Sequence, residues 1–415
     1  MRKYIKLAAE SEYLLGKLGN GLKVVCRQRE GRVSYIGVVV NAGSRDEDIT
    51  HEGLAHFVEH TIFKGTDKRR SWQISSRMES LGGELNAYTS KEETMVYTNA
   101  PAGYEERAIE LLYDLVSASN FPINEIDKER DVVIEEIYSY LDSPSDRVYD
   151  EFEELAYKGS RLSHNILGTP ESVRKLCSED CRNFISRNYT PSNLVVYCMT
   201  PLSPERMMKL VEKYFGNILR ENNPSRRMLP PEMLRFHEVR DYNGHQANTI
   251  MGGRLFGRND ARRFPMYLIN NYLAGPCMNS VLNRELREKK GYVYTVDSNV
   301  SLLSDTGLML IYFACDPSKV EKCKNIIRRE IDSLCQNTLS TRKLEKIKLQ
   351  YCGQLIASSD QIESRAMAMG KSVLYFGKVN EISTTIERIM EVTAEELRTA
   401  AELIAEDKLS SLTLI

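Results

Sequence analysis

The sequence predicts an α+β fold of two homologous α/β-roll domains, each a mainly antiparallel sheet with helices packed on one face. Strand-like runs alternate apolar and polar residues, and helix-like runs repeat apolar residues every three to four positions. The order of these runs occurs twice along the chain. A proline-rich stretch at residues 219–236 separates the two copies and divides the chain nearly in half.

The repeated elements can be followed in both halves. In the first half, a strand-like run at residues 35–41 precedes a helix, a glycine turn, two strands and a helix at residues 105–119. In the second half, a strand-like run at residues 249–253 opens the same order, which ends in a helix at residues 319–334. The same order of elements in two copies indicates an internal duplication.

The boundary between the copies has the composition of a linker. Residues 219–236 carry Pro224, Pro230 and Pro231 among charged residues, without a sustained apolar period. We therefore expect one domain at residues 1–218 and a second, homologous domain at residues 237–415.

The composition excludes several classes of protein. The 415 residues include 56 basic and 58 acidic side chains, interspersed, for a formal net charge of −2. A protein that binds nucleic acid or a membrane surface would show a basic patch, so we expect neither partner. Glu10 and Glu12 interrupt the N-terminal apolar residues, so we expect no signal peptide, and no run is long enough to span a bilayer. The nine cysteines contain no CxxC pair and are expected to be reduced thiols of a cytoplasmic protein.

The stretch GLAHFVEHTIFKGT predicts a helix at residues 52–63 that is ended by Gly65. One face of this helix is apolar and consists of Leu54, Phe57, Val58 and Ile62. His56, Glu59 and His60 lie on the opposite face, which on an ordinary helix faces solvent. Histidines four residues apart are one turn apart, however, and can hold one metal ion, with Glu59 beside them to act on a water molecule.

A second helix, at residues 124–141, offers a third ligand. Its apolar stripe consists of Ile126, Val133, Ile137 and Leu141. Glu136 flanks this stripe and can face inward, whereas Glu135 lies almost opposite it and should be solvated. Glu129 lies two turns before Glu136 on nearly the same side. Two inward carboxylates are costly unless a positive charge lies nearby, and a divalent ion would supply one.

The segments HFVEHTIFKGT, GGELNAYTSKEETMVY and ERDVVIEEI resemble the pitrilysin-type (inverzincin, M16) zinc metallopeptidases. The resemblance is to the branch that contains the mitochondrial processing peptidase and its bacterial relatives, and it covers nearly the whole chain. It implies that His56, His60 and Glu136 bind one zinc ion and that Glu59 is the general base. It also implies that Glu129 helps to hold the site.

Further residues match the family's substrate-contacting positions. Arg287 and Tyr294, in RELREKKGYVYTV, match an arginine–tyrosine pair that contacts bound substrate, and Tyr294 would help to stabilise the oxyanion. The alternative is a solvated cation at a helix end and a tyrosine packed on the sheet. The strand LNAYT at residues 85–89 resembles one whose edge pairs with the substrate backbone through Asn86 and Ala87. The alternative is an ordinary internal strand.

The resemblance therefore implies a zinc-dependent endopeptidase that hydrolyses peptides or unfolded segments in an enclosed chamber formed by a homodimer. The first domain would be the catalytic, zinc-binding one and the second the substrate-binding one. Two alternatives remain open: a catalytically silent scaffold or partner subunit of the same fold, and an active subunit that requires a different partner chain. His164 lies in a predicted loop and is not among the family's ligands.

Overall fold

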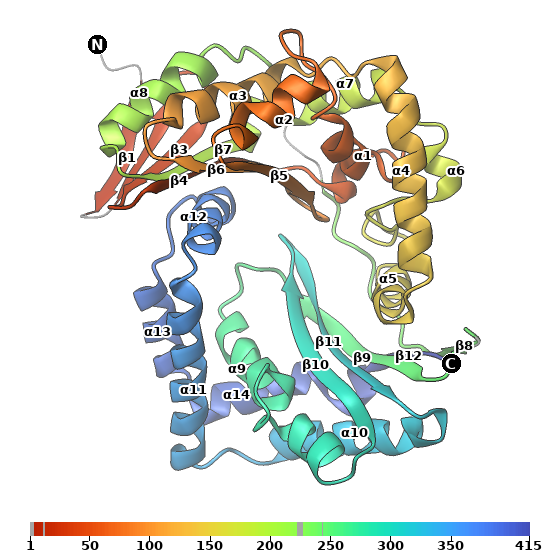
Figure 1. Ribbon diagram of the computed structural model, residues 1–415. Helices are drawn as coiled ribbons and strands as arrows, with labels where there is room; N and C mark the ends of the chain where they lie inside the picture. The colour runs from red at the N-terminus through yellow and green to blue at the C-terminus, as the bar shows by residue number, and fades with distance from the viewer. Residues whose placement is uncertain (1–3, 11–12, 222–226, 243) are drawn as a thin grey trace. The chain divides into compact units, whose positions relative to one another are not determined.

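The computed structural model describes residues 4–10, 13–221, 227–242 and 244–415. The chain forms two compact units, each with its own sheet (Figure 1). The first unit consists of Met1–Ile137, His164–Arg227 and Asp360–Asn380, and the second of Tyr138–Ser163, Met228–Ser359 and Glu381–Ile415. The predicted α+β fold with two mainly antiparallel sheets is confirmed.

The sheet of the first unit has seven strands in the order β1-β2-β3-β7-β4-β6-β5. Their bounds are β1 Tyr4–Glu10, β2 Tyr13–Leu18, β3 Lys23–Gln28, β4 Val33–Val40, β5 Glu84–Thr89, β6 Thr94–Pro101 and β7 Leu194–Thr200. All neighbouring strands are antiparallel except β3 and β7, which are parallel. Strand β5 lies at one end of this order, so among the described residues it has a strand partner on one side only.

Most helices of the first unit share one apolar core with the sheet. They are α1 Leu54–Thr61, α2 Ser71–Glu79, α3 Glu105–Ala118, α4 Ile123–Leu141, α6 Pro170–Val173, α7 Ser178–Asn188 and α8 Pro204–Phe215, with the short turns η1 Ser44–Asp46 and η2 Pro191–Asn193. One further helix, α12 (Ile362–Phe376), packs on the other sheet face, where Met369 and Val373 contact a cluster that includes Val39 and Tyr197. The sequence did not predict this helix on the second face.

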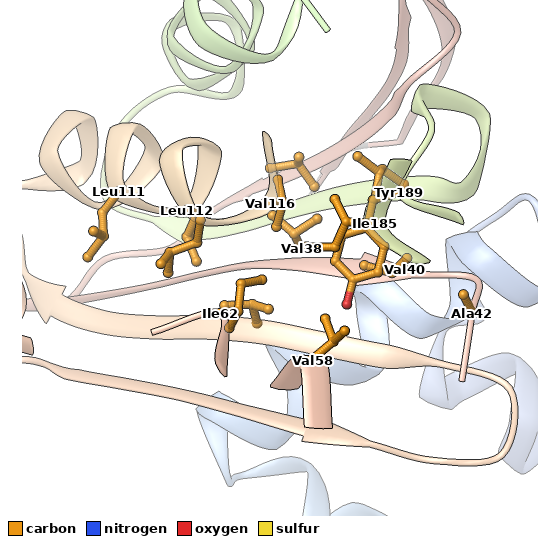
Figure 2. Close-up of a cluster of buried hydrophobic side chains, with 14 of the residues drawn as sticks. Val38, Val40, Ala42, Val58, Ile62, Leu111, Leu112, Val116, Ile185 and Tyr189 are labelled. Atoms are coloured by element: carbon orange, nitrogen blue, oxygen red, sulfur yellow. The ribbon is translucent and has the colours of Figure 1, made fainter. Parts of the chain in front are cut away.

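Helix α1 is anchored by its apolar face, as its spacing predicts. Leu54, Phe57, Val58 and Ile62 are all buried. Figure 2 shows Val58 and Ile62 in one cluster with Val38, Val40, Leu111 and Leu112. Burial of one such side chain contributes roughly 1.5–3 kcal/mol. The helix therefore has a fixed orientation, with His56, Glu59 and His60 turned away from the core.

The sheet of the second unit repeats the strand arrangement on a smaller scale, in the order β10-β11-β9-β12-β8. Its strands are β8 His237–Arg240, β9 Ala247–Phe256, β10 Val293–Leu302, β11 Thr306–Cys315 and β12 Ser410–Leu414. As in the first sheet, one pair of strands is parallel and the others are antiparallel; here the parallel pair is β12 and β8, at the end of the order. The five strands correspond in order and direction to β5, β6, β4, β7 and β3, which supports the predicted duplication.

The helices of the second unit also cover both sheet faces. One face packs against α9 Arg263–Ala274, α10 Val320–Gln336, α11 Thr341–Ser359, α13 Ile382–Glu391 and α14 Ala394–Ala401. The shorter helical turns are η3 Asn283–Glu288, η4 Pro317–Lys319, η5 Glu402–Ile404 and η6 Glu406–Lys408. The other face packs against α5, Pro144–Ala156, through Val148, Phe152 and Ala156. Each sheet therefore carries one helix whose sequence comes from the other half of the chain.

The strands of the two sheets fall on either side of the predicted linker at residues 219–236, and the domain boundaries themselves stay a prediction. Residues 222–226 of that linker lie outside the described residues. Just before them, the guanidinium of Arg220 donates to the carbonyl oxygens of Val116 and Ser117 at 2.9 and 2.8 Å. The first end of the linker is thereby fixed to the end of α3.

The exposure of individual side chains can be compared with two further predictions. Cys26 and Cys198 are fully buried, as predicted. Leu141 was assigned to the apolar stripe of its helix, but its side chain is 42% exposed, so that assignment was wrong. The last turn of α4 lies outside the apolar core that buries Val133 and Ile137. Among the described residues, no helix combines the length and the apolar character needed to cross a membrane.

Candidate metal centre

Helices α1 and α4 bring the three predicted ligands together. One donor atom from each of His56, His60 and Glu136 can be chosen so that all lie within 4.8 Å of one another. Glu136 Oε2 lies 3.2 Å from Nε2 of His60 and 3.8 Å from Nε2 of His56. The two imidazole rings meet edge to face, with centroids 4.6 Å apart. On α4, Glu136 is half-buried and Glu135 is exposed, as the helical wheel predicts.

Glu129 supports the site from behind His60. Its Oε1 lies 3.0 Å from His60 Nδ1, and its Oε2 accepts a hydrogen bond of 2.7 Å from Lys64 Nζ. An ionised carboxylate only accepts, so Nδ1 of His60 carries a hydrogen and donates it. Burial alone would raise the pKa of Glu129, but the His60 and Lys64 hydrogen bonds outweigh burial and lower it. Glu129 is therefore a buried, charged residue that fixes the orientation of the His60 ring.

The donor set fits a divalent metal. With Nδ1 of His60 bonded to Glu129, the neutral ring has its lone pair on Nε2, which faces a carboxylate oxygen of Glu136 at 3.2 Å. Two electron-rich atoms at this distance repel each other unless a proton or a cation lies between them. Burial would lower the pKa of His60, but Glu129, Glu136 and Glu59 outweigh it and raise the pKa, so a proton or a metal ion is favoured there.

His56 is a neutral imidazole. It is buried, and burial together with the neighbouring His60 lowers its pKa to about 3. Its Nδ1 is buried and has no hydrogen-bond partner among the described residues. A neutral imidazole in an apolar setting is the form that binds zinc. Two imidazoles and one carboxylate are also the ligand types of catalytic zinc sites, which keep one position open.

Glu59 completes the site from the same helix. It is half-buried beside Thr89, the last residue of β5. Burial raises the pKa of Glu59, and the contacts with Thr89 and His60 act against that rise. A carboxylate with a raised pKa is better suited to take up a proton near neutral pH than an exposed one. Glu59 therefore lies beside His60 with a pKa above its ordinary value.

The predicted peptide-binding residues lie on an edge strand beside this helix. Asn86 is exposed and Ala87 half-buried on β5, where they are paired with Tyr97 and Val96 of β6. The other edge of β5 has no strand partner among the described residues. An extended peptide can add to such an edge through main-chain hydrogen bonds.

Arg287 and Tyr294 belong to the second unit. Arg287 lies on the η3 turn with its side chain 43% exposed, 3.9 Å from Glu288. Tyr294 lies on β10 where the pairing with β11 shifts register between Val293 and Thr295. Such a bulge redirects a side chain, and Tyr294 is 81% exposed rather than packed on the sheet. Both side chains are therefore available to a ligand.

Sequence reasoning missed Lys64 as part of the site. Lys64 follows His60 by four residues, a spacing that on the predicted helix at residues 52–63 would put the next turn on the side of His60, although α1 ends at Thr61. That spacing was the available signal. The hydrogen-bond partner of Lys64, Glu129, is distant in sequence, so the pair itself becomes visible only in the fold.

Known proteins resemble this chain over most of its length. Residues 23–170 match the family model described as insulinase (peptidase family M16), and residues 175–351 match the one described as peptidase M16 inactive domain. The chain is 31% identical over 392 residues to an uncharacterized zinc protease of Streptomyces coelicolor, covering 92% of this chain and 85% of that one. It is 30% identical over 390 residues to an uncharacterized zinc protease of Bacillus subtilis, covering 94% and 95%.

Solved structures share the fold over nearly the whole chain. A protease from Helicobacter pylori superimposes with a TM-score of 0.91 at 21% identity, covering 97% of this chain and 99% of that chain. A structure from Pseudomonas fluorescens described as a peptidase M16 inactive domain gives a TM-score of 0.89 at 18% identity, covering 97% of each. The sequence matches and the shared fold lead to one assignment: this chain belongs to peptidase family M16, the insulinase family.

Proposed function

We propose that this protein is a zinc-dependent endopeptidase with His56, His60 and Glu136 as ligands of one zinc ion. The observation that carries the proposal is the convergence of these three side chains next to Glu59. Relatives that share about 30% of the sequence are named zinc proteases, which supports the choice of metal and reaction.

The reaction would be the hydrolysis of a peptide bond. When bound, zinc would supply a Lewis acid that polarises the scissile carbonyl and lowers the pKa of water. Glu59 would take a proton from the attacking water and deliver it to the leaving amine. Glu129 and Lys64 would keep His60 in the ligand orientation. This division of roles separates Glu59, which moves protons, from the residues that hold the metal.

The substrate would be an extended peptide or an unfolded segment. Main-chain pairing with the free edge of β5, at Asn86 and Ala87, would align its backbone beside Glu59 without strict sequence preference. Arg287 and Tyr294 of the second unit would contact the same peptide, with the Tyr294 hydroxyl donating to the developing oxyanion. Both side chains are exposed, which supports a role in binding rather than packing.

The assembly we propose is a homodimer that encloses a chamber, in the cytoplasm. Closed two-fold dimers are the commonest soluble assemblies, and the near-neutral charge balance gives no reason to expect nucleic-acid or membrane partners. Because the chain carries the zinc residues and the arginine–tyrosine pair, we expect one kind of chain to suffice.

The test is digestion of a mixed peptide library by the purified chain, with zinc content measured on the same sample. We expect one zinc per chain and cleavage that stops with a chelator and returns with zinc. Zinc without cleavage of any peptide would favour a silent scaffold. Cleavage only after a second, different chain is added would favour a subunit of a mixed complex.

A further inference from the structure

We infer that Glu47 and His164 form a positioning pair that fixes the start of α1 and thereby the placement of His56, Glu59 and His60. The inference rests on the proposed zinc function, and it assigns roles to a buried carboxylate and to a histidine that lies outside the ligand set. The hydrogen-bond partners of the two side chains are Gly53, Ala55, Ser44 and each other, and none of these is a ligand.

The start of α1 needs an acceptor that its own sequence does not provide. The residue before the helix, Gly53, has φ 88° and no side chain, so it cannot accept from the amides of the first turn. Glu47 supplies the missing acceptors. Its Oε2 accepts from the amide of Gly53 at 2.9 Å, and its Oε1 accepts from the amide of Ala55 at 2.7 Å.

Glu47 is held in place by His164. Nε2 of His164 lies 3.0 Å from Glu47 Oε2 and 3.1 Å from the carbonyl oxygen of Ser44. Both neighbours are acceptors, so Nε2 carries the hydrogen. Lys91 Nζ donates to the His164 carbonyl at 2.6 Å, which fixes the backbone behind the ring. The Glu47 carboxylate, 1% exposed, thus receives three hydrogen bonds from two amides and one imidazole.

The same segment packs tightly against the start of α1. A Cβ added to Gly53 would lie 2.6 Å from the carbonyl oxygen of Leu167, and one added to Gly168 would lie 2.5 Å from that of Glu52. The backbones of residues 52–53 and 167–168 are therefore in direct contact. His164 and the glycine contact fix one end of α1 at two points.

The position of this end determines the geometry of the metal site. The amide held by Glu47 belongs to Ala55, the residue directly before His56, and Glu59 and His60 follow within about one turn. The third ligand, Glu136, stands on α4, so a shift of α1 along its axis changes the distances of both histidines to Glu136. A misplacement of about 1 Å can cost roughly 100-fold in rate.

The test uses Glu47→Gln, which keeps the shape of the side chain but replaces one acceptor by a donor. All three partners of Glu47 donate, so the new amide group must face at least one of them. The matched control is Glu105→Gln: Glu105 is 2% exposed and accepts from Ser34 Oγ at 2.8 Å and the Gly103 amide at 3.0 Å, on a helix without ligands.

We would measure zinc affinity by chelator competition, the visible spectrum of the Co²⁺-loaded chain, and kcat and KM on a peptide. Glu47→Gln should bind zinc roughly 10- to 100-fold more weakly, change the Co²⁺ spectrum and lower kcat with little change in KM. Glu105→Gln should resemble the wild type. Equal zinc affinities and spectra for the two variants would overturn the inference, whereas a wild-type chain that binds neither metal would overturn the proposed function instead.

If Glu47→Gln does not fold, as judged by circular dichroism, two substitutions at His164 test the role of the Glu47–His164 pair instead. His164→Ala removes the donor to Glu47, and His164→Gln can restore one. We expect His164→Ala to weaken zinc binding several-fold and His164→Gln to recover much of the loss. Wild-type zinc affinity and Co²⁺ spectra in both variants would refute the pair's role.

Discussion

Substitution of Glu129 by Gln tests the support behind the metal site. The carboxylate accepts from His60 Nδ1 at 3.0 Å and from Lys64 Nζ at 2.7 Å, and both partners are donors. Glutamine keeps one acceptor, so one of the two bonds is lost. A hydrogen bond to a charged group contributes about 1.5–3 kcal/mol, which corresponds to roughly 10- to 100-fold weaker zinc binding. Competition with a chromophoric chelator at fixed pH and salt measures this directly.

The control is on the same helix. Glu135 is exposed and adjacent to the proposed ligand Glu136, so Glu135→Gln removes the same charge without changing any contact of His60. We expect this control to bind zinc as the wild type does. If both variants bound zinc equally well, the carboxylate behind His60 would have no part in holding the metal, and the reasoning from the hydrogen bonds would be refuted.

Four further outcomes are expected. Glu59→Gln should keep its zinc but lose about 100- to 10,000-fold in kcat, and a nearly normal kcat would contradict the general-base role. Tyr294→Phe should lower kcat/KM by roughly 10- to 1,000-fold with unchanged zinc content, as measured on one peptide. Ile62→Ala should reduce the free energy of unfolding by about 2–5 kcal/mol in urea titrations, because the side chain is fully buried in the α1 cluster. Light scattering should show a dimer at micromolar concentration, and a monomer alone would count against the assembly.

The sequence was sufficient for features that depend on local spacing. The period of α1 separates its apolar face from His56 and His60, and the wheel of α4 distinguishes Glu136 from Glu135, because a helix places side chains at fixed angles. The structure agrees on each of these points. The sequence also predicted that the order of elements is repeated, and five strands of each sheet correspond in order, although the order of the strands within a sheet was not predicted.

The features that could not be predicted from the sequence depend on contacts between segments that are distant along the chain. The acceptor for the first amides of α1 comes from Glu47, whose partner His164 is more than a hundred residues further on. The bulge that exposes Tyr294 is a property of the pairing between β10 and β11 rather than of either strand alone. Periodicity shows which face of an element is buried but does not identify what covers it.

The packing of α12 on the first sheet has a consequence for biosynthesis. The apolar face that includes Val39 and Tyr197 is complete once β7 has been synthesised, but its cover, Met369 and Val373, leaves the ribosome only after β8 to β11. Until then the nascent chain presents an apolar sheet surface of the kind that aggregates or recruits chaperones. A product that ends near residue 218 lacks Met369 and Val373 and therefore carries this apolar surface without its cover.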